Sequence, residues 1–276
     1  MKPKLAFSSN AFKRATLAEA IAAIASIGYR GVEVMADKPH AWPADMTPAR
    51  IDELVSQLDA IGLAVSNVNA FTMFAVGDTY HPSWIANDPA ARRQRIEHTR
   101  AAIRLAGAIG AKTVSIEPGG PLAGVDRAAA PLRFREGIEQ VLADAQAAGV
   151  TIAIEPEPEL LIERSTEYLE FVADFATPLV KMNLDLGHMF CVGEDPAEAA
   201  LRLAGEYVHV HLEDIAASRV HRHLVPGLGA MDFEAIFRSL EKAGYNGWVT
   251  VELYPYESTA EAAARQAFEF LKRFAI

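Results

Sequence analysis

The chain alternates short apolar runs with longer segments in which apolar residues recur every three or four positions. A continuous apolar run of about four to eight residues is typical of a strand buried on both faces, whereas the wider spacing is typical of an amphipathic helix. The pattern predicts eight strands, at residues 4–9, 31–35, 63–71, 112–120, 150–158, 180–186, 207–212 and 248–254.

Helices are expected between these strands, and residues with strong capping preferences mark their ends. Thr16 begins the first helix with Glu19 three residues later, which is the pattern of a capping box, and Gly28 ends it. The predicted helices span residues 16–27, 47–61, 90–108, 131–148, 165–175, 196–204, 232–243 and 259–274. The loop at residues 72–89 is long, and long loops in compact domains are usually functional, so we expect it to form a lid.

Eight strands alternating with eight helices favour a single (β/α)8 barrel (TIM barrel) domain over residues 1–276. A doubly wound sheet is the alternative. That fold usually carries a glycine-rich phosphate-binding turn after its first strand, and the segment SSNAFKR at residues 8–14 has no glycine. A barrel also constrains function, because its catalytic groups lie at the carboxyl ends of the strands.

Composition narrows the classes of partner. Hydrophobic residues make up 51% of the 276 positions, enough for a substantial core, and the formal net charge of −10 should repel nucleic-acid backbones. The first residues lack the apolar run of a signal peptide, and no segment has the roughly 18 apolar residues of a membrane span. The single cysteine, Cys191, excludes an internal disulfide. We therefore expect a cytoplasmic protein that binds neither nucleic acid nor membranes.

Polar residues close most of the predicted strands. They are Glu33, Asn67, Asn69, Glu117, Glu155, Glu157, Asp185, His211 and Glu252. Carboxylates inside the mouth of an apolar barrel repel one another, and each needs a proton or a cation to offset its desolvation. A single acidic residue at a strand end is more often a solvated carboxylate or a helix cap. Four metal-binding side chains at the ends of strands five to eight instead indicate one shared metal site.

The four side chains in question are those of Glu155, Asp185, His211 and Glu252. Three carboxylates and one imidazole form a mostly oxygen ligand set, which suits Mn²⁺ best, with Mg²⁺, Co²⁺ and Zn²⁺ as alternatives. The roles of Glu33, Glu117 and Asn69 stay open between substrate contact and structural hydrogen bonding.

Five motifs lie at or after the later strands: IEPEP at residues 154–158, DLGH at 185–188, HVHLED at 209–214, HRHLVPGLGAMDF at 221–233 and GYNGWVTVELY at 244–254. Through them the whole chain resembles the xylose isomerase-like TIM-barrel superfamily, which includes sugar isomerases, ketose 3-epimerases, inosose isomerases and dehydratases, and endonuclease IV. The resemblance implies that Glu155, Asp185, His211 and Glu252 ligate the metal. It also implies that Glu155 and Glu252 act as acid and base, and that His188 binds substrate or a second metal.

The segment around His221 departs from part of this superfamily. Endonuclease IV has an Asp-Arg-His triplet where this chain has His221, Arg222 and His223, and Asn69 and Glu117 stand where its further histidines would be. We therefore do not expect a three-zinc centre. In the epimerases the position of His223 resembles that of an arginine that reaches the substrate, so we expect His223 to face the substrate. The alternative is that His221 and His223 are exposed loop histidines. The predicted substrate-binding residues are His188, His223, Glu157, Glu117 and Asn69.

The predicted reaction begins when the metal acidifies the C–H bond beside a substrate carbonyl and stabilises the enediolate. Protonation by the second glutamate from the opposite face gives epimerisation, and protonation at the neighbouring carbon gives isomerisation. Two glutamates that face each other favour these reactions, so we expect a metal-dependent sugar isomerase or epimerase whose substrate is a sugar or a cyclitol ketone.

Two other classes stay open. One is a lyase, such as an inosose or 3-dehydroshikimate dehydratase or a C-glycoside-cleaving enzyme, and the other is a non-catalytic sugar-binding barrel. Relatives often form oligomers, and the apolar lid residues Phe71, Phe74 and Trp84 could pack on substrate, in the core, or on a second copy in a homo-oligomer.

Overall fold

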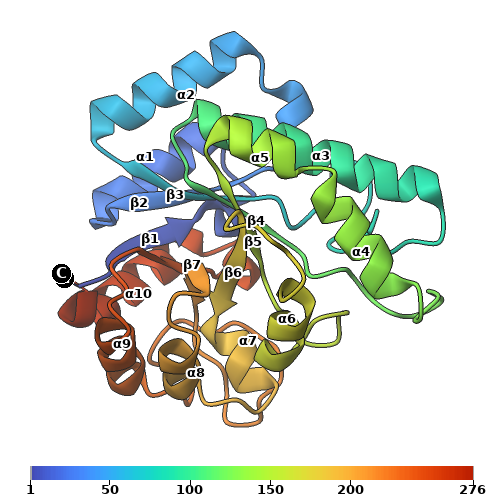
Figure 1. The fold of residues 1–276 in the computed structure, drawn as a ribbon. Coiled ribbons are helices and arrows are strands. Elements are labelled where there is room, and N and C mark those ends of the chain that lie inside the picture. Colours follow the sequence, from blue (N-terminus) through green and yellow to red (C-terminus); the bar gives the residue numbers. More distant parts are fainter. Residues whose placement is uncertain (1, 276) are drawn as a thin grey trace.

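Eight parallel strands close into a barrel in the computed structural model, which describes residues 2–275 (Figure 1). The strands follow one another around the barrel in chain order, and β1 pairs with β8 to close it. Their bounds are β1 Lys4–Ser8, β2 Gly31–Met35, β3 Ala64–Asn69, β4 Thr113–Ile116, β5 Thr151–Ile154, β6 Val180–Asp185, β7 Tyr207–Leu212 and β8 Trp248–Val251. This architecture is the (β/α)8 barrel that the sequence pattern predicts.

Helices connect consecutive strands and surround the barrel, as Figure 1 shows. They are α1 Leu17–Ile27, α2 Pro48–Ile61, α3 Pro89–Ala108, α4 Ala130–Glu139, α5 Leu142–Ala148, α6 Ser165–Val172, α7 Leu186–Cys191, α8 Pro196–Arg202, α9 Phe233–Lys242 and α10 Ala260–Ala275, with short 3-10 segments η1 Ser9–Phe12, η2 Pro43–Asp45 and η3 Tyr254–Tyr256. The predicted cap of α1 is present, because the Thr16 hydroxyl accepts the Glu19 N–H and the Glu19 carboxylate accepts the Thr16 N–H. Of the helices in residues 2–275, none is both long and apolar enough to cross a membrane.

Two helical regions differ from the sequence prediction. The segment predicted as one helix at residues 131–148 forms α4 and α5, with a break at Gln140 and Val141. Gly137, whose lack of a side chain leaves room for the Trp84 indole, weakens the helix just before this break. The helix α7 was not predicted. Asp185 ends β6 and immediately caps α7, since its carboxylate accepts the His188 N–H at 2.7 Å.

The loop between β3 and α3 is fixed over the barrel mouth by two charged side chains that are both buried. Asp37, which follows β2, accepts hydrogen bonds from the Thr72 hydroxyl and from the backbone N–H groups of Phe74 and Ala75. Arg95, in α3, donates to the backbone carbonyls of residues 70, 71 and 82. These contacts tie both ends of the loop to the barrel, so it holds a defined conformation above the strand ends.

The aromatic residues of this loop divide between the core and the surface. Trp84 is buried and packs edge-on against Phe134, and Phe71 is also buried. Phe74 is 43% exposed. Trp84 therefore belongs to the core, and Phe74 is the lid residue of the three that reaches solvent.

Candidate active site

The four predicted metal ligands meet at one end of the barrel. Glu155 and Glu252 directly follow β5 and β8, Asp185 is the last residue of β6, and His211 lies in β7. Because the carboxyl ends of parallel strands share one rim, these side chains converge. Each offers a ligand atom that lies within 4.8 Å of the other three, and all four residues are buried.

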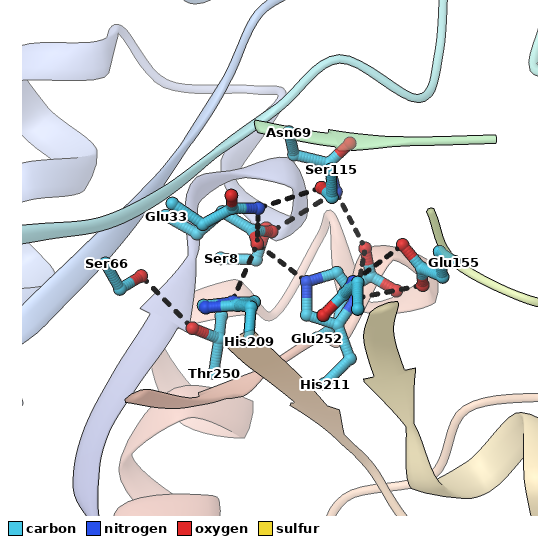
Figure 2. A network of polar contacts seen from close by, with 12 residues as sticks. Ser8, Glu33, Ser66, Asn69, Ser115, Glu155, His209, His211, Thr250 and Glu252 are labelled. Carbon is cyan, nitrogen blue, oxygen red and sulfur yellow. Dashed lines mark hydrogen bonds and ion pairs between the residues drawn. The ribbon is translucent and has the colours of Figure 1, made fainter. Parts of the chain in front are cut away.

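His211 connects this cluster to a buried carboxylate behind it. Its Nδ1 atom lies 2.9 Å from Glu155 Oε1 and 3.9 Å from both Asp185 Oδ2 and Glu252 Oε1. Its Nε2 atom lies 2.6 Å from Glu33 Oε2, on the other side of the ring (Figure 2). Burial lowers the pKa of His211, but the charges of Glu155, Glu33 and Glu252 outweigh burial and hold that pKa well above its ordinary value. A carboxylate on the far nitrogen is the usual companion of a metal-binding histidine.

Glu33 is itself held by donors from β3 and β7. Its carboxylate accepts hydrogen bonds from the side-chain amides of Asn67 and Asn69, and His209 Nε2 lies 3.3 Å from Oε2. Burial raises the pKa of Glu33, but the charge of His211 and the hydrogen bonds from both histidines hold it well below its ordinary value. The sequence left the role of Glu33 open. The structure places it behind His211, outside the lining of the pocket described below.

The cluster carries more negative charge than its own hydrogen bonds balance. Burial raises the pKa of Glu252 well above its ordinary value, and the neighbouring carboxylates add to this effect while His211 opposes it. Burial also raises the pKa of Glu155. Asp185 Oδ2 is buried and has no hydrogen-bond partner. An unpartnered carboxylate oxygen beside an imidazole nitrogen and two more carboxylates fits a divalent cation, which would neutralise the cluster.

A pocket opens directly above the cluster. Glu155 and Glu252 line it, so both carboxylates are within reach of a substrate. Of the predicted substrate-binding residues, Asn69, Glu157, His188 and His223 line it as well. The lid completes the wall with Phe71, Thr72, Phe74, Thr79 and Tyr80.

Glu117 is the predicted substrate-binding residue that does not line the pocket. Its carboxylate accepts the Gly119 N–H at 2.7 Å and lies 3.9 Å from Arg95 Nε. Burial raises the pKa of Glu117, although the charge of Arg95 opposes this. These contacts make Glu117 a support for the loop after β4 and for the lid, and its side chain does not reach the pocket.

Three histidines form one side of the pocket. His188 Nδ1 lies 3.0 Å from the carbonyl oxygen of Pro156, and His223 Nδ1 lies 2.9 Å from that of Glu252. These contacts assign the proton to each Nδ1 and leave a lone pair on each Nε2. His221 Nε2 lies 3.2 Å from His223 Nε2. Because His223 is 1% exposed, the alternative of an exposed loop histidine is wrong for this residue.

Two side chains that contact the site carboxylates were not predicted from the sequence. Asn10, in η1, donates to Glu252 Oε1 at 2.8 Å, and the Tyr80 hydroxyl donates to Glu157 Oε1 at 3.1 Å. Asn10 follows a strand as the other site residues do, so its position was a usable signal. Tyr80 lies within the long loop, where no pattern distinguishes it from its neighbours.

The two acidic residues after His211 have different surroundings. Glu213 is buried close to Asp185, and burial together with the charge of Asp185 raises its pKa well above the ordinary value. Asp214 instead accepts backbone N–H groups of the following loop, including those of Gly227 and Gly229. Asp214 is therefore a structural residue of that loop.

Comparison with known proteins gives one family and several relatives. The profile of the xylose isomerase-like TIM barrel family matches residues 21–274. The L-ribulose-5-phosphate 3-epimerase UlaE of Salmonella paratyphi A is 26% identical over 251 residues, which cover 87% of this chain and 82% of the relative.

Solved structures share the fold at lower identity. The 3-keto-D-glucoside 4-epimerase YcjR from E. coli has a TM-score of 0.81 and 18% identity, and the similarity covers 99% of this chain and 100% of that one. The IOLI protein, solved with a zinc atom, has a TM-score of 0.79 and 18% identity over 98% of this chain and 99% of that one. Likeness at this level of identity shows the fold alone.

Proposed function

Because the chain belongs to the xylose isomerase-like TIM barrel family, we propose that it is a divalent-metal-dependent sugar epimerase or isomerase. The curated relatives are 3-epimerases, which confirms the prediction that the chain is an enzyme. One observation carries the proposed activity. The two glutamates that line the pocket, Glu155 and Glu252, belong to the same buried cluster as Asp185 and His211.

The proposed metal ligands are Glu155, Asp185, His211 and Glu252. This oxygen-rich set suits Mn²⁺, with Mg²⁺, Co²⁺ and Zn²⁺ as alternatives. A bound divalent ion would act as a Lewis acid on the substrate carbonyl. Glu33 would hold His211 by its Nε2 atom and so keep Nδ1 directed at the cluster.

Glu155 and Glu252 would transfer the substrate proton. They enter the pocket from β5 and β8, which are separated by β6 and β7, so they approach a substrate from different sides. One carboxylate would remove the proton from the carbon beside the carbonyl, giving the enediolate. The other would return a proton to the opposite face, which gives the epimer, or to the neighbouring carbon, which gives the isomer. Because burial raises the pKa of both groups, each can carry a proton closer to neutral pH than an exposed glutamate.

The remaining pocket residues would position the substrate and exclude water. His188 keeps an Nε2 lone pair without a hydrogen-bond partner, and this atom can accept a hydrogen bond from a sugar hydroxyl, whereas the Nε2 atom of His223 faces His221 Nε2. The Tyr80 hydroxyl, which donates to Glu157, brings the lid against the barrel side of the pocket. The apolar lid residues Phe71 and Phe74 would cover the reacting carbon and keep bulk water from it.

The test is exchange of a substrate C–H hydrogen with solvent deuterium. Protein loaded with Mn²⁺ or Mg²⁺ is incubated in D2O with ketoses, inososes and keto acids, and Mn²⁺ is chelated before NMR spectra are recorded. We expect metal-dependent deuterium uptake at the carbon beside the carbonyl. In Glu155→Gln and Glu252→Gln the rate should fall by at least about 100-fold, since each variant lacks one acid–base group.

Glu269→Gln is the matched control, because Glu269 lies on the outer surface of α10 and pairs with Lys272. This variant should exchange at the wild-type rate. Uptake that persists in both pocket variants, or in protein stripped of metal, would contradict the proposal. Irreversible formation of an unsaturated carbonyl product, without exchange into recovered substrate, would identify the lyase class instead.

A further inference from the structure

The chain has many backbone N–H donors at the carboxyl end of the barrel, and its own carboxylates occupy them. A phosphate ester is normally recognised there by unoccupied loop amides, by a helix N-terminus or by arginine. We infer that the substrate is an uncharged polyhydroxy ketone and not a phosphate ester, since the groups that would bind phosphate are already used. This inference rests on the proposed sugar epimerase or isomerase activity.

The loop after β7 shows most clearly that carboxylates of the chain occupy its backbone N–H donors. Asp214 Oδ2 accepts the N–H groups of Gly227 at 2.9 Å and Gly229 at 2.7 Å. Asp214 Oδ1 accepts those of Ile215 at 2.9 Å and Met231 at 3.2 Å. The glycine-rich turn thus surrounds an anion, as a phosphate-binding turn does, but the anion belongs to the chain.

Other loops on the same face repeat this arrangement. Asp37 accepts the N–H groups of Phe74 and Ala75, and Asp78 accepts those of Tyr80 and His81. Four of the helices are capped by carboxylates as well, whereas α1 and α2 are capped by the hydroxyls of Thr16 and Thr47 and α4 has no side-chain cap. The capping residues are Asp88 for α3, Asp185 for α7, Asp195 for α8 and Asp232 for α9. These amide groups and helix termini therefore have an acidic partner before any ligand arrives.

The side chains around the pocket also disfavour a phosphate. Among the described residues that line it, Lys13 is the one cation of fixed charge, and Glu155, Glu157 and Glu252 line the same pocket. The Lys13 ammonium group lies 2.6 Å from Glu257 Oε1, so it already has an anionic partner. Arg222, between two pocket histidines in sequence, is exposed and does not line the pocket.

The same walls suit a neutral polyol. The Asn10 side-chain oxygen, which is buried without a hydrogen-bond partner, and the hydroxyls of Thr72 and Thr79 can accept from sugar hydroxyl groups, and Phe74 offers an apolar surface to sugar C–H bonds. In this respect the chain would differ from its relative UlaE, whose name specifies a phosphorylated ketose.

The experiment compares each ketose with its own phosphate ester on the metal-loaded enzyme. L-Ribulose and L-ribulose 5-phosphate form one pair, and D-fructose and D-fructose 6-phosphate form the other. In the pair that exchanges deuterium faster, we expect kcat/KM to be at least about 10-fold higher for the free ketose than for its phosphate ester. This ratio corresponds to ~1.4 kcal/mol. A value for the ester equal to or above that for the free ketose overturns the inference.

Two variants test whether a cation near the pocket mouth acts as a hidden phosphate anchor. In Lys13→Gln and Arg222→Gln the ratio of the two kcat/KM values should change by less than about threefold, because neither side chain would contact a phosphate. A loss of more than about 10-fold that is confined to the ester identifies an anchor and overturns the inference.

Binding without turnover separates this inference from the proposed reaction. Ribitol and ribitol 5-phosphate have no carbonyl and cannot enolise, so isothermal titration of the metal-loaded protein reports recognition alone. We expect ribitol to bind at least about 10-fold more tightly than its ester. Tighter or equal binding of the ester, or no binding of ribitol, overturns the inference. Failure of every ketose and ester to exchange deuterium, with ribitol still preferred, refutes the proposed reaction and leaves the preference for neutral ligands in place.

Discussion

The two sides of the barrel mouth differ in how their buried polar groups are satisfied. On the side of β2–β4, the Asn67 side-chain amide donates to Glu33 and to the Ser115 hydroxyl, and its carbonyl accepts from Thr113. On the side of β6 and α7, several buried side-chain atoms have no hydrogen-bond partner. They include Asn183 Oδ1, Asp185 Oδ2 and His188 Nε2.

This difference distinguishes residues that stabilise the site from residues that would bind a ligand. A network in which every group has a partner is stable without a ligand, whereas an unpartnered buried polar atom raises the free energy of the folded state until something else binds it. The β2–β4 side therefore holds His211 in place through Glu33, and the side of β6 and α7 is where an ion and a substrate would supply the missing partners. Variants on each side should change different properties.

The largest effect should follow from Asp185→Asn. We expect Mn²⁺ affinity to fall by at least about 100-fold because a proposed ligand is lost. The stability of the metal-free protein should stay the same or rise, since a buried carboxylate oxygen without a hydrogen bond is removed and asparagine also caps helices well. Mn²⁺ titration followed by electron paramagnetic resonance and urea denaturation measure the two quantities. Asp174→Asn, which removes a surface partner of Arg135, is the control. If Asp185→Asn bound Mn²⁺ with wild-type affinity, the side of β6 and α7 would not be the ion-binding side of the barrel mouth.

Glu33→Gln should affect both properties, since Glu33 belongs to the satisfied network and also contacts His211. We expect Mn²⁺ affinity to fall by about 10–100-fold, as is typical when the partner of a ligand histidine is lost. The free energy of unfolding should fall by ~1–3 kcal/mol because charged hydrogen bonds are replaced. The same titrations apply. Lower stability at unchanged Mn²⁺ affinity would show that Glu33 stabilises the fold and does not contribute to metal binding.

Tyr80→Phe should have a smaller effect that is confined to the pocket. It removes the hydrogen bond to Glu157 and leaves the ring, so kcat/KM for deuterium exchange should fall by roughly 3–10-fold. Stability should change by less than ~0.5 kcal/mol, because Tyr80 lies in a loop. Tyr256→Phe, outside the pocket lining, is the control. Equal effects of both substitutions would show that the Tyr80 hydroxyl has no particular role.

His98 provides a reference outside the barrel interior. It lies in α3 with its ring 4.8 Å from that of Trp42, and burial, aided by Arg95, lowers its pKa to about 3. The unfolded imidazole binds a proton below pH ~6.5 and the folded one does not, so the free energy of unfolding should fall by up to ~1.4 kcal/mol per pH unit from pH 6.5 downward. Urea denaturation from pH 7 to 5 measures this slope. His98→Phe should lack the contribution of His98 to this pH dependence. An unchanged slope in this variant would refute the low pKa of His98.

The barrel and the convergence of its ligands could be predicted because each depends on a local pattern. The strands are short apolar runs, and Glu155, Asp185, His211 and Glu252 lie where those runs end, so parallel topology alone brings them together. The metal-binding role itself stays a prediction until an ion is measured.

Features that depend on contacts between distant segments could not be predicted. Glu117 follows its strand as Glu155 does, yet its surroundings are set by Arg95, a residue of the helix predicted at residues 90–108 that lies far from Glu117's strand in sequence. The break between α4 and α5 adjoins Gly137, which packs against Trp84 of the lid. No pattern within either segment carries this information.

The capture of loop amides by Asp214 also limits how the protein can evolve. An evolved variant that bound a phosphate through the Gly227 and Gly229 amides would first have to lose Asp214. Four backbone N–H groups would then lack their hydrogen-bond acceptor. Each intermediate on that route would be less stable than its parent, so it would persist only after stabilising substitutions elsewhere. Mutational drift towards phosphorylated substrates is thus restrained by the folding requirement of one loop, independently of any selection on the reaction.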